Sequence, residues 1–223
     1  MATVKVIDLI DRAETVLQDT TNTRWAQAEL LGYLNDAQRE IVMQRPDAKI
    51  TNATFTCAAS SKQTLPSGAL RLVDVIRNAT GKAITQIDRK VLDVQNPSWH
   101  TGSGNTAVEH FMYDPSDPKN FYVYPVPTNS VQINIAYSES TADITISNYS
   151  TSTDTIGLDD TYANAILDYM LYRAYQKDSD FGGNMQKVAT HYQSFANSIG
   201  LKTRADLVIT PQADDMRSGI QAV

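Results

Sequence analysis

The segment from Leu158 to Asp180 constrains the fold more than any other, because its apolar residues spread over most of a helix. Six aliphatic or small residues form one broad face, and four tyrosines occupy much of the remaining surface. A helix that is apolar nearly all round has to be covered on several sides. We therefore expect this helix either at the centre of a helical bundle or at a contact with another subunit. In the second case, Tyr162, Tyr169 and Tyr172 are the residues expected at that contact.

Three other segments have helical spacing. Between Val4 and Pro46, apolar residues recur in two stripes: Val6, Ile10, Ala13 and Leu17, then Leu30, Leu34, Ala37 and Ile41. Thr23 is a plausible N-cap for the second of these helices, and Pro46 ends it because proline disfavours helical geometry in the residue before it. A fourth helix follows the turn SDFGGN and is expected to end at Gly200.

The middle of the chain has a different pattern. Short runs with β-branched or aromatic residues are separated by Gly, Pro, Asn and Ser, and each run suits a strand: ATFTC, LRLVDVIRN, KAITQI, VEHFMYD, NFYVYPVP, VQINIAYSES and DITIS. In VQINIAY, residues 131, 133, 135 and 137 are expected on a buried face and the residues between them on a wet face.

Together these patterns predict an α+β fold in three parts. Residues 1–49 and 156–202 are expected to form a four-helix bundle from two N-terminal and two C-terminal helices. Residues 50–155 are expected to form a β-rich insertion. Residues 203–223 contain too little apolar sequence for a core of their own, so we expect an extended C-terminal tail.

No arrangement of residues in the sequence points to catalysis, a cofactor or a metal. The three histidines, His100, His110 and His191, are far apart and lack metal-ligand spacing, and His191 is expected on the solvated side of its helix. The glycine-rich TGSGNT at 101–106 lacks the Lys-Ser/Thr ending of a phosphate-binding loop. Turn chemistry accounts for Asp114 and Asp117 between their prolines. We therefore expect a protein that is not an enzyme.

Composition excludes further classes. The net charge of −6 and the pI near 5.0 give no reason to expect a basic face that grips nucleic acid. A single cysteine, Cys57, excludes a disulfide framework within the chain. No run of about eighteen apolar residues is present to cross a bilayer. The first residues lack the pattern of a secretory signal, so we expect a protein assembled in a reducing cytoplasm.

Trp99 is unusual because it is a large aromatic residue in the polar stretch NPSWHTGSG. It either anchors its own loop or contacts a partner. Because so little apolar sequence flanks it, we favour the partner contact.

The sequence RWAQAELLGYLNDAQREIVMQRPDA, residues 24–48, resembles the second helix of the head-to-tail adaptor proteins of tailed bacteriophages, also called head-completion or tail tubular proteins. That family has the pattern W-x-x-x-E-L-L-x-Y-L-N-x-A-Q-R-E-I-x-x-x-R-P-D. Four further segments are similar to the family in the same order: LPSGALRLVDVIRN, FYVYPVP, LDDTYANAILDYMLYRAYQKDSD and ATHYQSFANSIG. The resemblance covers about residues 4–202.

This resemblance implies a structural virion protein at the head-tail junction, assembled in the host bacterial cytoplasm. Such a protein forms a ring, usually of about twelve copies, between the portal protein and a downstream nozzle or tubular tail protein. DNA passes through the ring without specific binding. The C-terminal segment docks on the portal in this family, so Leu207, Val208 and Ile209 are expected to run extended against a portal chain. Trp99 is expected at the contact with the tail protein.

Two other classes of function remain open. The chain could be an interaction or carbohydrate-binding module of another phage tail component, with the β insertion as its recognition surface. It could also be a small hydrolase, although no nucleophile, base and orienting group can be proposed together. The Ser/Thr-rich segment 138–156 has no role that its sequence indicates.

Overall fold

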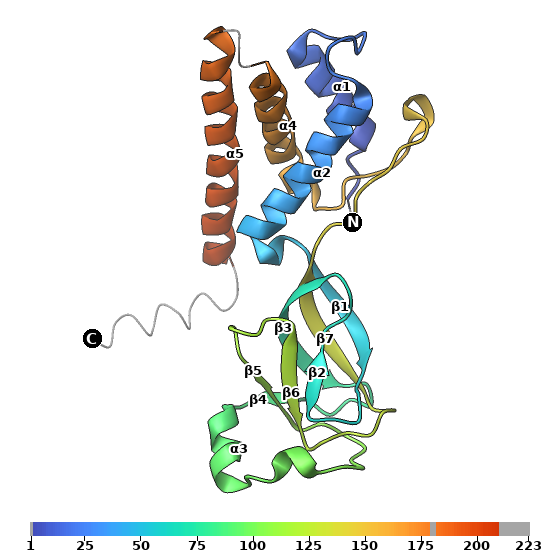
Figure 1. Ribbon diagram of the computed structural model, residues 1–223, viewed down its shortest axis with the longest axis vertical. Helices are drawn as coiled ribbons and strands as arrows, with labels where there is room; N and C mark the ends of the chain where they lie inside the picture. The colour runs from blue at the N-terminus through green and yellow to red at the C-terminus, as the bar shows by residue number, and fades with distance from the viewer. Residues whose placement is uncertain (1, 179–181, 210–223) are drawn as a thin grey trace, which may run out of the picture. The chain divides into compact units, whose positions relative to one another are not determined.

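A computed structural model describes residues 2–178 and 182–209 of the chain, and its fold is α+β, as the sequence predicts (Figure 1). The described residues form five α-helices and two β-sheets. They divide into two compact units. The helical unit comprises the described parts of 1–45 and 141–223, and the β unit comprises 46–140.

The helical unit contains four helices, which are α1 (Val6–Leu17), α2 (Gln27–Gln44), α4 (Ala163–Lys177) and α5 (Gly182–Ile209). Both predicted N-terminal stripes are buried in its core. The apolar spacing therefore identified correctly which side of α1 and which side of α2 face inward.

Helix α4 is the central helix of this unit. It packs against α5 on one side and against α1 and α2 on the other (Figure 1). Its buried residues point in several directions and comprise Ala163, Ala165, Ile166, Tyr169, Met170, Leu171, Ala174 and Tyr175. Trp25, just before α2, adds a polar link because its indole N–H donates to the carbonyl of Ala174 at 3.2 Å. Contacts within one chain thus cover most of the apolar surface of α4.

The turn between α1 and α2 is organised by Asp19. Its carboxylate accepts hydrogen bonds from the backbone N–H groups of Trp25, Arg24 and Thr23, and these bonds lower the pKa of Asp19. The prediction that Thr23 caps α2 is wrong, because α2 begins at Gln27 and the residue before it, Ala26, makes no side-chain cap. The acid four residues before Thr23 supplies the acceptor instead.

A connecting segment, residues 141–162, leads into α4 and is bonded to the first helices. The N–H of Val6 donates to the carbonyl of Asp154 at 2.9 Å, and Gln38 accepts from the N–H of Gly157 at 2.5 Å. Asp160 accepts from Thr3 and from the N–H of Val4. These bonds hold α4 in its place between α5 and the N-terminal helices.

The β unit contains two sheets. The antiparallel sheet has the strand order β1-β7-β3, with β1 (Ile50–Thr56), β7 (Gln132–Glu139) and β3 (Ala69–Asn78). The mixed sheet has the order β2-β6-β5-β4, with β2 (Lys62–Thr64), β6 (Asn120–Tyr124), β5 (His110–Tyr113) and β4 (Thr85–Gln86). A short helix, α3 (Arg89–Gln95), follows β4.

Both sheets contribute side chains to one core, in which Ile133, Ile135, Phe121 and Val123 are fully buried. The predicted buried face of residues 131, 133, 135 and 137 is confirmed. The predicted wet face is only partly correct, because Ala136 is also buried. Since β7 is the middle strand of its sheet, it has a neighbour on both sides.

Two predictions for the middle of the chain differ from the structure. The run DITIS at 143–147 is not a strand, because Asn35 of α2 bonds both the N–H and the carbonyl of Ile144 and so replaces a strand partner. Helix α3 was not predicted, although its N-cap, Asp88, accepts from the N–H of Lys90 as helix caps do.

The end of the last helix also differs from the prediction. Helix α5 continues through Gly200 to Ile209. Gly200 does not have the positive φ angle that a helix-ending glycine adopts, and good helix formers follow it. Leu207, Val208 and Ile209 therefore belong to α5 and are not extended. The remainder of the predicted tail, 210–223, lies outside the described residues.

Three glycines of the helical unit give a matched test of its packing. A methyl group at Gly32 or Gly200 would meet no atom within 4 Å, whereas one at Gly157 would lie 3.1 Å from Oε1 of Gln38. Alanine is favoured over glycine inside a helix by roughly 0.5–1 kcal/mol. Gly32→Ala and Gly200→Ala should therefore raise the free energy of unfolding by about that amount, and Gly157→Ala should lower it, in urea titrations followed by circular dichroism. A Gly157→Ala protein as stable as the parent would contradict the tight contact with Gln38.

Acid should weaken the attachment of the N-terminal residues to the connecting segment. Hydrogen bonds from the Thr3 hydroxyl and from the N–H groups of Val4 and Thr3 lower the pKa of Asp160 below its ordinary value of 3.8. A lowered pKa in the folded state adds stability above the unfolded pKa, and that stability is lost as pH falls through the folded pKa. Asp160→Asn should thus reduce the melting temperature at pH 7, and the difference from the parent should shrink below about pH 4. Asp11→Asn, an exposed carboxylate of α1, controls for the loss of one charge.

Candidate interaction surfaces

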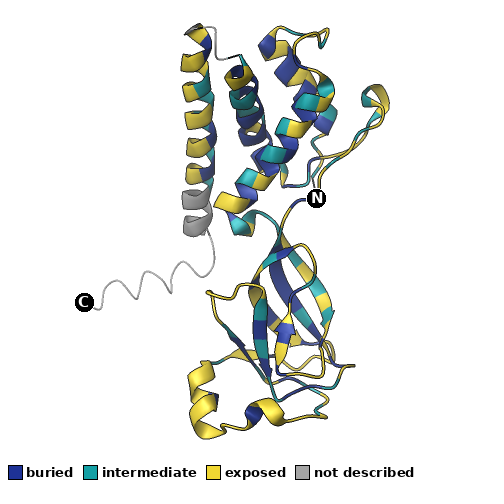
Figure 2. Cartoon of the chain, in the orientation of Figure 1, coloured by how far each residue is buried: buried dark blue, intermediate teal, exposed yellow. Residues whose placement is uncertain are grey.

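The outer side of α5 is the most open helix face of the helical unit. Its buried residues face α4, and the opposite side is exposed along its described length (Figure 2). Helix α5 also exposes three large apolar side chains, Met185, Tyr192 and Leu201, which are 56%, 46% and 64% exposed. Met185 and Tyr192 lie on nearly the same side of the helix, whereas Leu201 lies far round it, next to Gly200 on the outer face.

A shallow hollow of about 340 Å³ lies towards the C-terminal half of this face. Ala196, Asn197, Gly200 and Leu201 line it. Gly200 has free space where a side chain would lie, which makes room for an incoming group. Asn197 and Leu201 are one turn apart on the same side of the helix, so an amide and an apolar side chain border the hollow together and suit an amphipathic side chain.

An aromatic row joins α5 to α4 beneath this face. The ring centroids of Tyr169 and Phe195 are 5.1 Å apart, and those of Tyr172 and Tyr192 are 5.2 Å apart. Of the three tyrosines expected at a subunit contact, Tyr162 and Tyr169 are buried within the chain. Tyr172 is partly exposed beside the exposed Tyr192. Only Tyr172 therefore keeps surface for another subunit.

The sequence predicted that His191 of α5 is solvated, but its side chain is partly buried. Its Nδ1 lies 3.0 Å from a carboxylate oxygen of Asp168, and its ring stacks on Tyr175 at 5.7 Å. Among the described residues, no group of three His, Cys, Asp or Glu side chains could hold a metal ion. The His191–Asp168 pair links α5 to α4 and has a structural role in that contact.

Part of the connecting segment projects from the helical unit as an arm, residues 145–153 (Figure 1). The two ends of the arm are fixed, because Asp143 forms an ion pair with Arg39 and the carbonyl of Asp154 bonds to Val6. Between these ends, none of the nine residues is buried. Asn148 accepts from the N–H and the hydroxyl of Ser150, which shapes the tip. The arm is thus anchored at its base and exposed along its length.

The arm has the composition of a contact loop. Its sequence TISNYSTST is rich in hydroxyl groups and contains a single aromatic residue, Tyr149, next to the tip. Tyrosine, serine and asparagine are the residues that binding loops use most, because they combine hydrogen bonding with apolar area. The arm on α1 and α2 and the open face of α5 lie on opposite sides of the helical unit (Figure 1).

Charge is distributed unevenly between these two regions. Residues 141–172 contain five Asp and no Lys, Arg or Glu. Residues 181–205, which include most of α5, contain Lys187, Lys202 and Arg204 and no Asp or Glu. The connecting segment is therefore acidic in sequence and α5 is basic, although Asp143 pairs with Arg39, and Lys187 and Lys202 lie over the rings of Tyr175 and Tyr162.

In the β unit, Trp99 anchors its own loop. Its side chain is 2% exposed, its Nε1 donates to Asp93 at 2.9 Å, and its ring stacks on His100 at 3.7 Å. The edges of Tyr122 and Tyr124 complete its surroundings. The prediction that the Trp99 side chain itself contacts a partner is therefore corrected. The alternative of an anchor under the loop describes it.

Helix α3 is tied to Trp99 through Asp93 and exposes apolar residues that the sequence did not reveal. Val94 is 82% exposed, and Val91 is also exposed. Two valines on the outside of a short helix form a small apolar patch. The signal in the sequence was the capping residue Asp88 followed by RKVLDVQ, which is too short for a clear helical period.

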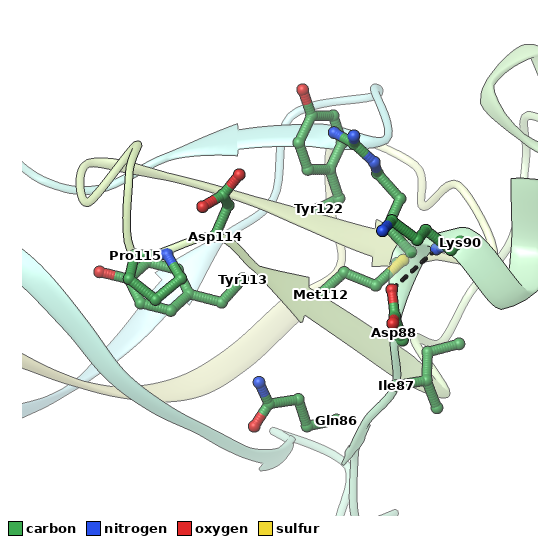
Figure 3. A pocket seen from close by; sticks show the side chains of 10 residues that line it. Gln86, Ile87, Asp88, Lys90, Met112, Tyr113, Asp114, Pro115 and Tyr122 are labelled. Carbon is green, nitrogen blue, oxygen red and sulfur yellow. Dashed lines mark hydrogen bonds between the residues drawn. The ribbon is translucent and has the colours of Figure 1, made fainter.

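A cavity of about 500 Å³ lies beside the Trp99 loop, and Met112 and Tyr122 belong both to its lining and to the surroundings of Trp99. Figure 3 shows Met112 and Tyr122 within it, with Asp114 on one side and Lys90 beside Asp88 on the other. The guanidinium of Arg89 lies 5.9 Å from the centre of the Tyr122 ring. Charges of both signs around an apolar floor suit a protein contact, and no side chain in the cavity has a partner that would activate it as a nucleophile.

Two further observations concern the last turn of α5 and the apolar character of the helices. The backbone of Leu207, Val208 and Ile209 forms the last turn of α5, and their side chains lie outside the described part. None of the described helices has both the length and the apolar character that a membrane span requires.

Comparison with known proteins agrees with these observations. No curated protein matches the chain significantly. The model of the family described as SU10 adaptor protein matches residues 4–217, which is nearly the whole sequence. The resemblance to phage adaptors drawn from the sequence is thereby confirmed. The chain belongs to the SU10 adaptor protein family, a family of bacteriophage head-tail adaptors.

Proposed function

We propose that this structural adaptor forms a ring between the portal and the tail of a phage particle and extends the DNA channel. The match to the adaptor family over residues 4–217 is the observation that carries the proposal. The open faces of both units support it, because an adaptor works through extended contacts with several neighbours. A ring of about twelve copies, as the resemblance implies, has closed symmetry that satisfies every subunit contact.

The channel should let DNA pass without holding it, and the charge of the protein supports this role. Strong DNA binding comes from Lys and Arg side chains that displace counterions from phosphates. The chain has 19 Lys and Arg against 25 Asp and Glu, and many of the cations pair with carboxylates, as Lys82 does with Glu109 at 2.6 Å. We expect no reaction to be catalysed, and the ring to assemble on the portal rather than alone.

We place the portal contact at the C-terminal end of α5. Three consecutive apolar residues, Leu207, Val208 and Ile209, end this helix just before a polar segment. An apolar helix end in front of a polar segment can dock in a groove of a partner.

A triple substitution tests this portal contact. Leu207→Ala, Val208→Ala and Ile209→Ala together remove the apolar side chains but keep a good helix former at each position. We expect unchanged helicity by circular dichroism and loss of capture by an immobilised cognate portal. Met43→Ala removes an exposed apolar side chain from α2 and should bind as the parent does. Normal capture of the triple variant would mean that another part of the helical unit binds the portal.

We place the tail contact at the apolar patch of α3, with Trp99 as the residue that supports it from below. Val94→Ser should leave the melting temperature nearly unchanged, since exposed substitutions alter stability by less than about 0.5 kcal/mol. It should weaken attachment of the downstream tail protein. Trp99→Ala should lower the free energy of unfolding by about 3–5 kcal/mol, because the side chain is buried.

Val94→Ser tests the exposed patch of α3, and Trp99→Ala tests the buried residue that holds α3 in place. Attachment can be measured by co-sedimentation of portal–adaptor complexes with the tail protein. If Val94→Ser attaches normally, the α3 patch is not the tail contact.

A further inference from the structure

The helical unit has a projecting arm on one side and an open helix face on the other, and no described residue of the chain covers either. We infer that the arm of one copy, residues 145–153, packs on the outer face of α5 in the next copy of this chain. The inference rests on the proposed ring and names the surfaces that join its subunits.

The shape of the arm supports a partner outside its own chain. Its base is held by the Arg39–Asp143 ion pair, by Asn35, which bonds Ile144, and by the bond from Val6 to Asp154. A loop that is fixed at both ends and bears exposed hydroxyl groups and a half-buried tyrosine is preorganised for binding, because less conformational freedom is lost when it docks.

The outer face of α5 offers a matching surface. Leu201 and the glycine at position 200 border a hollow that has room for one side chain. Tyr149 is the only aromatic residue of the arm, and partial burial raises the pKa of its hydroxyl, which keeps it a neutral hydrogen-bond donor. An aromatic ring with a polar tip fits a hollow that is bordered by an apolar side chain, Leu201, and an amide, Asn197.

Charge favours contact between the arm and α5 over contact between two arms. The arm itself is uncharged; of the two acids at its base, Asp143 pairs with Arg39, whereas Asp154 is exposed. The acceptor helix has no acid between residues 181 and 205, and its described cations, Lys187 and Lys202, lie over the rings of Tyr175 and Tyr162. An arm facing another arm would bring acids together, whereas an arm facing α5 brings acids towards bases.

The positions of the two surfaces determine the kind of assembly. A contact between two different surfaces is heterologous and repeats from copy to copy, so it closes into a ring when the rotation per copy allows. Because the arm and α5 lie on opposite sides of the helical unit, each copy can give its arm to one neighbour and receive the arm of the other (Figure 1).

Cysteine cross-linking tests the contact in the full chain. The native Cys57 is buried and burial raises its pKa to about 11, so it should not react. Two single variants, Ser147→Cys on the arm and Asn197→Cys beside the hollow, are mixed with one of them tagged for size. The mixture is bound to cognate portal and treated with a short bismaleimide, and the products are separated on a denaturing gel. Met43→Cys, exposed on α2, replaces Asn197→Cys as the matched control.

We expect a tagged–untagged dimer from the Ser147→Cys and Asn197→Cys mixture at a yield at least several-fold above the Met43→Cys control. Adding Tyr149→Ala to the arm variant should reduce this yield several-fold, and Tyr149→Phe should largely retain it. Multimers that give arm–arm dimers only, or no cross-link above the control, would overturn the inference and leave the ring intact. A chain that stays monomeric with portal by mass photometry would overturn the inference and the ring together.

Discussion

The burial of α4 is the interaction on which the helical unit depends. This helix has apolar residues on several sides, and its neighbours come from both ends of the sequence: α1 and α2 before the β unit, and α5 after α4 itself. The chain must therefore return from the β unit and enter α4 along α1 and α2. The hydrogen bonds of Asp160 and Gly157 fix that return. Once α4 is enclosed, α5 has used one side only, and the described residues leave its other side open.

The distribution of surfaces fits a protein that connects others. The residues that line the cavity of the β unit form turns and a cation–π contact, and those that line the hollow on α5 are Ala196, Asn197, Gly200 and Leu201. Each unit presents its own exposed apolar residues, on α5 in one and on α3 in the other. A division of this kind lets one unit serve subunit and portal contacts while the other serves the tail, as the proposed function requires.

Periodicity explains what the sequence revealed and what it did not. The stripes of α1 and α2 and the alternation in β7 were predictable, because burial on one side leaves a repeat of 3.6 or 2 residues. The seven residues of α3 are too few to show a repeat. The end of α5 was missed because a glycine is read as a stop, while its effect depends on a backbone angle that the sequence does not state. The burial of Trp99 was missed because its partners, Tyr122 and Tyr124, are distant in the sequence.

The helical unit is discontinuous in the chain, whereas the β unit is formed by the uninterrupted residues 46–140. During synthesis the ribosome therefore releases all of the β unit before it releases α4. Domains fold as their residues become available, so the β unit can fold while the chain is still growing. The apolar sides of α1 and α2 must wait, because the helix that covers them is made later. Translation thus delays completion of the helical unit until nearly the whole polypeptide has left the ribosome.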